Sequence, residues 1–456
     1  RPRAWNLTWG ERHEPDAVFR GSTMSATGSQ SASPSATQPS RTRVRAKLDH
    51  REPYRLPLDF GGTPVTGFLV SVVAALRDHY GLVRRPVKVH EPYQMLGLID
   101  DDLKQAMGVD VEGVVGRETM FGFRNDEWVP WTTPQGLDVL VSATMHTTVD
   151  ERGDTLVYPK GNPAAAPSGR MPKTGFFFDT IVRQEPIVED ELDPADNLEE
   201  YEPLTQADLD DIEVDLRAYE ATGRGVIAVL PGMALGDIAF VPAPGLENPR
   251  GIRDITEWYI SIKKRPDYVD RVFSEQVEIA LENLALIHDK VGDRLDAVMT
   301  CGTDFGTQTS SFCSVDTFVD LWAPHYKRIN DWIHDHTTWK TFKHSCGSVE
   351  RFMASFIECG FDIINPVQCS AAHMEPEHLK REYGSDLVFW GGGVDTQHTL
   401  PFGSPEEVRE QVLQRCEVFG RDGGFVFTTI HNVQAATPVE NVVAVVDALH
   451  EFNART

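Results

Sequence analysis

The sequence is poor in cysteine, in basic residues and in long apolar runs, and each shortage excludes a class of protein. The six cysteines all follow residue 300 without regular spacing, which excludes a disulfide framework and predicts a reducing, cytoplasmic location. No apolar run approaches the roughly 20 residues that span a bilayer, and residues 1–20 lack the apolar core of a signal peptide. The 43 basic and 69 acidic residues give a formal net charge of -26, which repels nucleic acid and anionic membranes. We therefore expect partners that are small molecules or proteins.

The two parts of the chain differ in composition. Residues 1–45 are rich in serine, proline and threonine and have almost no periodic apolar residues, which predicts a disordered tail. Residues 46–456 are expected to form a single domain that carries an insertion at 119–220. Short aromatic pieces separated by turn signals up to residue 180 predict a small antiparallel sheet in this insertion. The acidic stretch 184–220 is typical of a solvated linker and helix face.

Short apolar runs alternate with longer amphipathic ones, which predicts parallel β/α units. The apolar runs read as buried strands at Val111–Val115, Val226–Leu230, Ala297–Thr300, Trp339–Phe342, Phe361–Ile364, Leu387–Trp390 and Phe425–Ile430. The amphipathic runs read as helices at Val272–His288, Val315–His336, Val349–Cys359, Pro405–Phe419 and Pro438–Phe452. Seven strands are close to the eight of a (β/α)8 TIM barrel, and we expect the eighth between Met233 and Leu286. An open doubly wound sheet is the alternative, but no Gly-x-Gly-x-x-Gly follows the first strand.

Polar and glycine-bearing residues follow nearly every predicted strand, at the end where barrel enzymes place their active sites. His344 and Cys346 are two residues apart at the end of one strand, so their side chains project to the same side. With His431 and Asp304 they form a chemically sensible zinc-ligand set, although a lone His-x-Cys also occurs by chance and a buried cysteine is usually inert packing.

Further residues at the same mouth are candidates for chemistry. We predict Asp304, Asp395 and His431 as catalytic groups, and cofactor contacts from Gln308, Asn365, Gln368, Gly392 and Gly393. The glycines around 392 are expected to permit a sharp turn or a close approach of the backbone to a substrate. The remaining cysteines, at 301, 313, 359, 369 and 416, are expected to be packing residues, and the histidines at 373, 378 and 398 to lie in surface loops.

Several of these motifs, in register, resemble one known family. They are Gly302-Thr303-Asp304-Phe305-Gly306-Thr307-Gln308, His344-Ser345-Cys346-Gly347, Asn365-Pro366-Val367-Gln368, Phe389-Trp390-Gly391-Gly392-Gly393-Val394-Asp395 and Thr437-Pro438-Val439-Glu440-Asn441-Val442. The stretch from about 296 to 450 is similar to the uroporphyrinogen decarboxylase superfamily. It resembles in particular the branch of zinc-dependent cobalamin:thiol methyltransferases. The resemblance implies a (β/α)8 barrel, and it implies zinc held by His344 and Cys346 with His431 at the position of the branch's third, cysteine, ligand.

The resemblance leaves three functions open. The first is a zinc-dependent methyl- or alkyl-transferase, with a methylated corrinoid on a partner protein as donor and a thiol-like acceptor. The second is a decarboxylase of a porphyrinogen or other polycarboxylate. It is disfavoured because the Arg-Gln-Ala-Gly-Arg segment of true decarboxylases is replaced here by Pro57-Leu58-Asp59-Phe60-Gly61-Gly62. The third is a non-catalytic protein that binds a tetrapyrrole or corrinoid.

Overall fold

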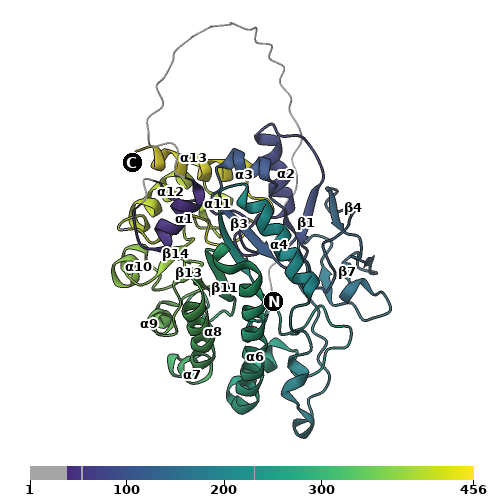
Figure 1. Cartoon of the computed structure of the whole chain (residues 1–456). Helices are drawn as coiled ribbons and strands as arrows, with labels where there is room; N and C mark the ends of the chain where they lie inside the picture. Colours follow the sequence, from purple (N-terminus) through teal and green to yellow (C-terminus); the bar gives the residue numbers. More distant parts are fainter. Residues whose placement is uncertain (1–38, 53–54, 231, 456) are drawn as a thin grey trace, which may run out of the picture. The chain divides into compact units, whose positions relative to one another are not determined.

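A parallel sheet of seven strands forms the centre of the structure, a computed structural model that describes residues 39–52, 55–230 and 232–455 (Figure 1). In the order in which they pair, the strands are β15 (Phe425–Val426), β14 (Val388–Trp390), β13 (Ile363–Asn365), β12 (Lys340–His344), β11 (Ala297–Cys301), β10 (Gly225–Val229) and β3 (Val111–Val115). All seven coincide with apolar runs from which strands were predicted, and every pairing in the sheet is parallel. The predicted succession of parallel β/α units is confirmed.

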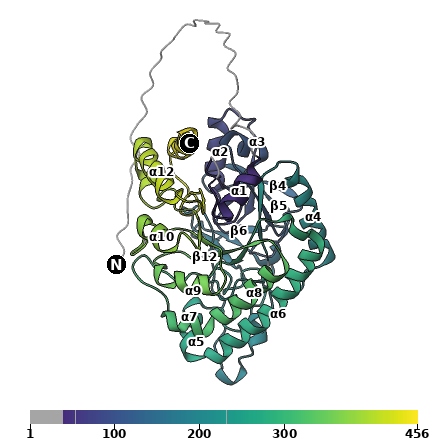
Figure 2. The same ribbon diagram turned by 60° about the vertical axis from the view of Figure 1, so that its left-hand side comes forward.

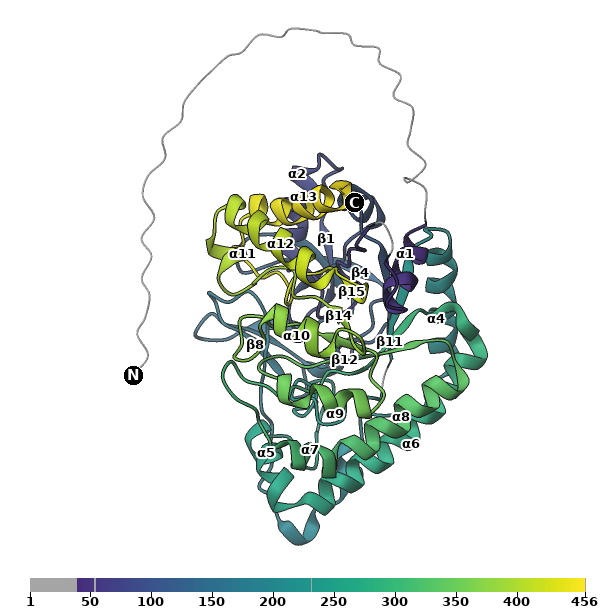
Figure 3. The ribbon, with the colours of Figure 1, turned by 90° about the vertical axis from the view of Figure 1, so that its left-hand side faces the viewer.

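Helices follow the strands and cover the outer face of the sheet (Figure 3). They are α2 (Val70–His79), α3 (Asp101–Met107), α4 (Gln206–Glu220), α5 (Ile255–Lys264), α6 (Pro266–Val291), α7 (Val315–Leu321), α8 (Ala323–His336), α9 (Met353–Glu358), α10 (Pro376–Tyr383), α11 (Thr399–Phe402), α12 (Pro405–Phe419) and α13 (Val439–Arg455). The long helices α6 and α8 run side by side (Figure 2). The start of α12 is fixed by a capping box between Ser404 and Glu407. Among the described residues, no helix is long and apolar enough to cross a membrane.

The gap between β15 and β3 is closed by a segment that was not predicted as a strand. The amide of Asp59 donates to the carbonyl of Phe427, and the amide of Phe427 donates to the carbonyl of Pro57, both at 2.9 Å. On its other side, the carbonyl of Leu58 accepts the amide of Asp110 at 2.8 Å, directly before β3. The segment 57–59 therefore occupies the eighth position and completes the ring.

The prediction of an eighth strand between Met233 and Leu286 is wrong. The described residues of that stretch form a loop, α5 and most of α6, and none of them is in a strand. The true closing segment gives little strand signal, because it begins with Pro57 and Gly61-Gly62 follows it closely. The residues directly after the closing segment pack closely on β3. A Cβ placed on Gly113, in β3, would lie 2.2 Å from the carbonyl oxygen of Gly62.

A short helix, α1 (Ser40–Leu48), covers the amino-terminal end of the barrel. Val44 is 1% exposed and packs in the same cluster as residues from the barrel strands. Arg41 and Arg45 both donate to the buried carboxylate of Asp296, which directly precedes β11. The predicted disordered tail therefore needs correction over residues 40–45, where packing and ion pairs stabilise a helix without a regular apolar period. Residues 1–38 of the predicted tail lie outside the described residues.

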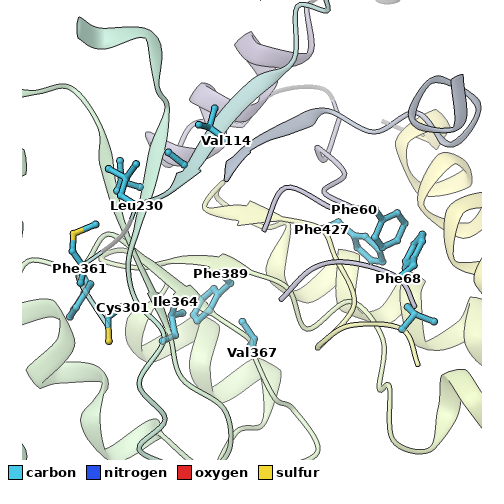
Figure 4. Packing of buried hydrophobic residues seen from close by; sticks show 14 of the residues in the cluster. Phe60, Phe68, Val114, Leu230, Cys301, Phe361, Ile364, Val367, Phe389 and Phe427 are labelled. Carbon is cyan, nitrogen blue, oxygen red and sulfur yellow. The ribbon is translucent and has the colours of Figure 1, made fainter. Parts of the chain in front are cut away.

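Alternation along the strands separates two apolar layers. Residues that point inward, such as Ile227, Phe342 and Trp390, fill the barrel. Residues that point outward, such as Ile364 and Phe389, pack between the sheet and its helices (Figure 4). The interior is thus a packed core, and polar side chains are left to gather at the carboxyl ends of the strands.

The insertion after β3 forms two small sheets. One has the order β2-β1-β5-β4 and the other the order β6-β7-β8-β9. Their strands are β1 (Val87–Glu91), β2 (Leu96–Gly97), β4 (Trp128–Thr132), β5 (Asp138–Ser142), β6 (Thr147–Val149), β7 (Thr155–Val157), β8 (Gly169–Met171) and β9 (Asp179–Thr180). All pairings in them are antiparallel except that of β1 with β5, so the insertion is bound to strands that precede it in the chain. The acidic stretch that follows ends in α4.

Candidate metal centre

Three predicted ligand residues lie together at the carboxyl end of the barrel. His344 is the last residue of β12, Cys346 follows it by two positions, and His431 lies in the loop after β15. Their ligand atoms are all within 4.8 Å of one another. The Sγ of Cys346 is 3.4 Å from Nε2 of His344, and the two imidazole rings are 5.5 Å apart, edge to face. Within the described part of the chain, no other group of three His, Cys, Asp or Glu residues has this spacing.

The hydrogen bonds of His344 leave one ring nitrogen free for a metal. Nδ2 of Asn365 donates to the carbonyl of Trp390 at 2.7 Å, so the other amide atom, Oδ1, faces the imidazole as an acceptor. Nδ1 of His344 must then carry the proton that it donates to Oδ1 of Asn365, at 2.6 Å. Nε2 keeps its lone pair and faces Cys346. Burial lowers the pKa of His344 to about 4, so this imidazole is neutral at pH 7.

His431 has the opposite arrangement. Its Nδ1 accepts the backbone N–H of Asn432 at 2.8 Å, which places the proton on Nε2. In this state Nε2 of His431 carries the proton, and ligation through that atom requires the proton to leave it. Burial and the neighbouring His344 lower its pKa to about 4, so it too is neutral at pH 7. Its role as a ligand stays a prediction.

Asp304 is held beside the cluster by the backbone of the neighbouring loop. Its Oδ1 accepts the N–H of Cys346 at 2.6 Å and lies 3.9 Å from Nε2 of His344. Burial raises the pKa of this carboxyl above its usual range. Burial and the adjacent Asp304 also raise the pKa of the Cys346 thiol well above its usual value. Cys346 therefore keeps its proton at neutral pH unless a cation displaces it.

A second carboxyl in this region, Asp237, was not predicted from the sequence. Its Oδ2 packs so closely on Gly302 that a Cβ there would lie 2.5 Å away. Burial raises the pKa of Asp237 to about 7, and the charge of Asp304 acts in the same direction. A carboxyl with this pKa exchanges its proton near neutral pH. The pair Gly236-Asp237, in the loop after β10, could have indicated this carboxyl. It lies several residues beyond Leu230, where the predicted strand ends.

Lys343 was missed as well, because the predicted strand ended at Phe342 and the candidate motif began at His344. Its side chain is fully buried on the outer face of β12, and its Nζ donates to the backbone carbonyl of His344. Lysine is almost never fully buried without a partner of opposite charge. A buried lysine next to a candidate metal centre is therefore less usual than a buried carboxyl such as Asp237.

The predicted cofactor contacts lie around the same mouth and have partners within the protein. Oε1 of Gln368 accepts the N–H of Gly347 at 2.7 Å, and Nε2 of Gln308 donates to Gln397 at 3.1 Å. Gly392 has a positive φ and packs on Val367, and a Cβ on Gly393 would lie 2.4 Å from the ring of Phe427. A sharp turn and close packing thus account for the glycines, and their cofactor contacts stay a prediction.

Asp395 contacts residues outside the cluster of His344, Cys346 and His431. Its Oδ1 accepts the N–H of Gln397 at 2.7 Å and its Oδ2 lies 3.0 Å from Nδ1 of His398. The His398 side chain is 77% exposed, as expected of a surface loop. No contact described for Asp395 joins it to His344, so its catalytic role is a prediction without geometric support.

Comparison with known proteins supports the resemblance noted in the sequence. Residues 250–452 match the family described as uroporphyrinogen decarboxylase (URO-D). A uroporphyrinogen decarboxylase of Anaeromyxobacter sp. (strain Fw109-5) is 39% identical over 61 residues, which are 13% of this chain and only 17% of the relative's length.

One solved structure extends the comparison to nearly the whole fold. A methyltransferase from Methanosarcina mazei superposes with a TM-score of 0.50 and 13% identity, over 91% of this chain and 99% of the other. At this identity the likeness concerns the fold alone. Residues 250–452, somewhat less than half of the chain, are thus similar to the uroporphyrinogen decarboxylase family, and a methyltransferase is among the proteins that share the α/β fold.

Proposed function

We propose that the protein is a zinc-dependent methyl- or alkyl-transferase that moves a methyl group between a corrinoid, or a related donor, and a thiol-like acceptor. The observation that carries the proposal is the convergence of His344, Cys346 and His431 within 4.8 Å. Sulfur and imidazole nitrogen are the ligands that zinc prefers, and catalytic zinc sites have three protein ligands and one open position. Asp304 is the candidate for a fourth ligand or for a hydrogen-bond acceptor beside the open position.

Within the donor set, His344 fits zinc in its protonation as well as in its position. His344 is neutral and has its Nε2 lone pair on the side of Cys346. When bound, zinc supplies a positive charge that favours the thiolate form of Cys346 and of a thiol acceptor. The proton released by the acceptor needs a base, and the two histidines are too weakly basic at pH 7 for that role. Asp237, with a pKa of about 7, is the better candidate.

The proposal also includes the methyl donor and a partner protein that carries it. A methylated corrinoid is too large to enter a packed barrel, so we expect a partner protein to present it at the mouth, above His344 and His431. The acceptor is expected to be a small molecule.

A decarboxylase is the second candidate, favoured by the 39% identity over 61 residues to a uroporphyrinogen decarboxylase. Its substrate would carry several carboxylates. Near the cluster such a substrate would meet the buried carboxyls Asp304 and Asp237, which repel it when ionised. This charge arrangement favours the transferase.

Zinc content provides the test. Purified protein should hold about one zinc per chain, and most of it should be lost on His344→Ala or Cys346→Ala, because each change removes a ligand from the site. Cys369→Ala is the matched control, since that half-buried thiol donates to the carbonyl of Val367. Stoichiometric zinc in both ligand variants would refute the metal site. Turnover of a carboxylated porphyrinogen would favour the decarboxylase.

A further inference from the structure

Lys343 is a buried lysine whose ammonium joins the two loops that carry candidate ligands. Nζ donates to the carbonyl of Thr303 and to that of His344, both at 2.6 Å, and to Sγ of Cys301 at 3.2 Å. Thr303 directly precedes Asp304, and His344 is itself a candidate ligand. One side chain thus fixes the ends of β11 and β12 relative to each other.

The contacts match the donors of an ammonium. Its three N–H groups face two carbonyl oxygens and a sulfur. Within the described part of the chain, no carboxylate oxygen lies within 4.0 Å of Nζ. The charge is instead surrounded by aromatic rings, with Nζ 5.0 Å from the ring centre of Phe305, 5.6 Å from Tyr326 and 5.7 Å from Phe356.

The backbone around Lys343 departs from regular pairing. The register between β11 and β12 shifts between Met299 and Cys301, so that Cys301 stands opposite Lys343. An irregularity of this kind bends a strand and changes the direction of the residues that follow it. The residues that follow here include Asp304.

Contacts above Lys343 hold the same two loops together from the other side. The amide of Phe305 donates to Oγ of Ser345 at 2.9 Å, and the amide of Ser348 donates to the carbonyl of Thr307 at 2.8 Å. With the bond from the Cys346 amide to Asp304, the loops are joined at several points. Among these connections, that of Lys343 alone adds a positive charge.

That charge acts on an anionic set of groups. A bound metal would be held by the Cys346 thiolate, with the Asp304 carboxylate next to it. Burial disfavours both anions, and the Lys343 ammonium is a cation that opposes this effect on each. An apolar side chain at this position would provide neither this field nor the two carbonyl contacts.

We propose that Lys343 is a positioning residue for the metal centre, which fixes the separation of Asp304 and Cys346 through its two carbonyl contacts and stabilises the anionic ligands through its charge. The inference rests on the proposed function, because it assumes that His344 and Cys346 bind zinc. It extends that function to a residue that contacts neither metal nor substrate. Residues that support ligands in this way change metal affinity by roughly 10- to 100-fold when replaced.

The test compares zinc affinity, measured by competition with a chromogenic chelator, in wild type, Lys343→Met, Lys343→Gln and Lys47→Met. Methionine replaces the aliphatic stem of lysine without its ammonium group, and glutamine retains one N–H donor group. Lys47 is a second buried lysine, on α1 at the opposite end of the barrel, and is the matched control. We expect the dissociation constant to rise roughly 10- to 100-fold for Lys343→Met, less for Lys343→Gln, and by less than about twofold for Lys47→Met.

Two further readouts separate positioning from a merely structural role. Thermal unfolding of the metal-free proteins reports the fold, and the sulfur-to-cobalt absorption of cobalt-loaded proteins reports the placement of Cys346. Weaker cobalt absorption in a folded Lys343→Met would support the proposal. Unchanged zinc affinity in both Lys343 variants would overturn it, and so would failure of both to fold, which would assign Lys343 to the core. Absence of zinc from wild type would instead refute the proposed function itself.

Discussion

Replacing His344 by asparagine should make the stability of the metal-free protein less dependent on pH. The folded pKa of His344 is lowered to about 4 by burial, against an ordinary value of 6.5 in the unfolded chain. The contribution of His344 to the free energy of unfolding is therefore complete above pH 6.5 and is lost as the pH falls toward 4. Over this range the imidazole binds a proton in the unfolded chain but not in the folded protein. Asparagine keeps an N–H donor for Asn365 and does not titrate.

The magnitude follows from these two pKa values. Between pH 7 and pH 4.5, proton linkage at one such imidazole lowers the free energy of unfolding by about 2.5 kcal/mol. His344 is 4% exposed, so solvent screening reduces this value little. Asp304 and Asp237 have raised pKa values and act with the opposite sign, but they are present in both proteins and cancel in the comparison.

The assay is urea unfolding in the presence of a chelator, at steps from pH 7 to pH 4.5. The wild type should lose about 2.5 kcal/mol more than His344→Asn over this range. His398→Asn, which removes an exposed histidine, should behave as wild type. A difference between wild type and His344→Asn that stays constant with pH would refute the reasoning, because it would mean that the imidazole is not held neutral by its surroundings.

Three further outcomes are expected. If His431 ligates zinc, His431→Cys should retain the metal and His431→Ala should weaken its binding, whereas equal zinc content in all three proteins would remove His431 from the ligands and favour the decarboxylase. Gly113→Ala should lower the free energy of unfolding by about 1 to 3 kcal/mol, because the closing segment lies against that position, whereas Gly116→Ala, which faces open space, should change it by less than about 0.5 kcal/mol. Limited proteolysis should cut first within the loops of residues 119–180 and should spare 225–452, and early cleavage inside 296–430 would contradict a single barrel.

The features predicted correctly from the sequence are those that depend on local period. Buried parallel strands appear as continuous apolar runs, so β12 and its neighbours were found, and with them the strand ends that carry His344 and Cys346. The position of His431 near these two residues was predicted from the same rule. Strand ends that meet at one mouth bring together residues that are distant in the chain.

The features that were missed depend on contacts between distant segments. The segment 57–59 is ordered by hydrogen bonds to Phe427 and Asp110, and no period within its own residues reports them. Asp237 lies in an irregular loop, where position is set by packing against Gly302. The proton positions on His344 and His431 depend on single hydrogen-bond partners, which the residue types do not specify.

The way the ring closes has a consequence for the order of folding. Asp59, in the closing segment, accepts a hydrogen bond from Nε1 of Trp390, 331 residues away in the sequence. During synthesis, the edge of this segment that faces β15 therefore stays unpaired until the last strands are made, and loop-closure entropy makes such distant pairing slow. An unpaired edge of this kind is a template for aggregation. Chains that end before β15 should consequently fail to accumulate as soluble protein, even when most of the barrel has been made.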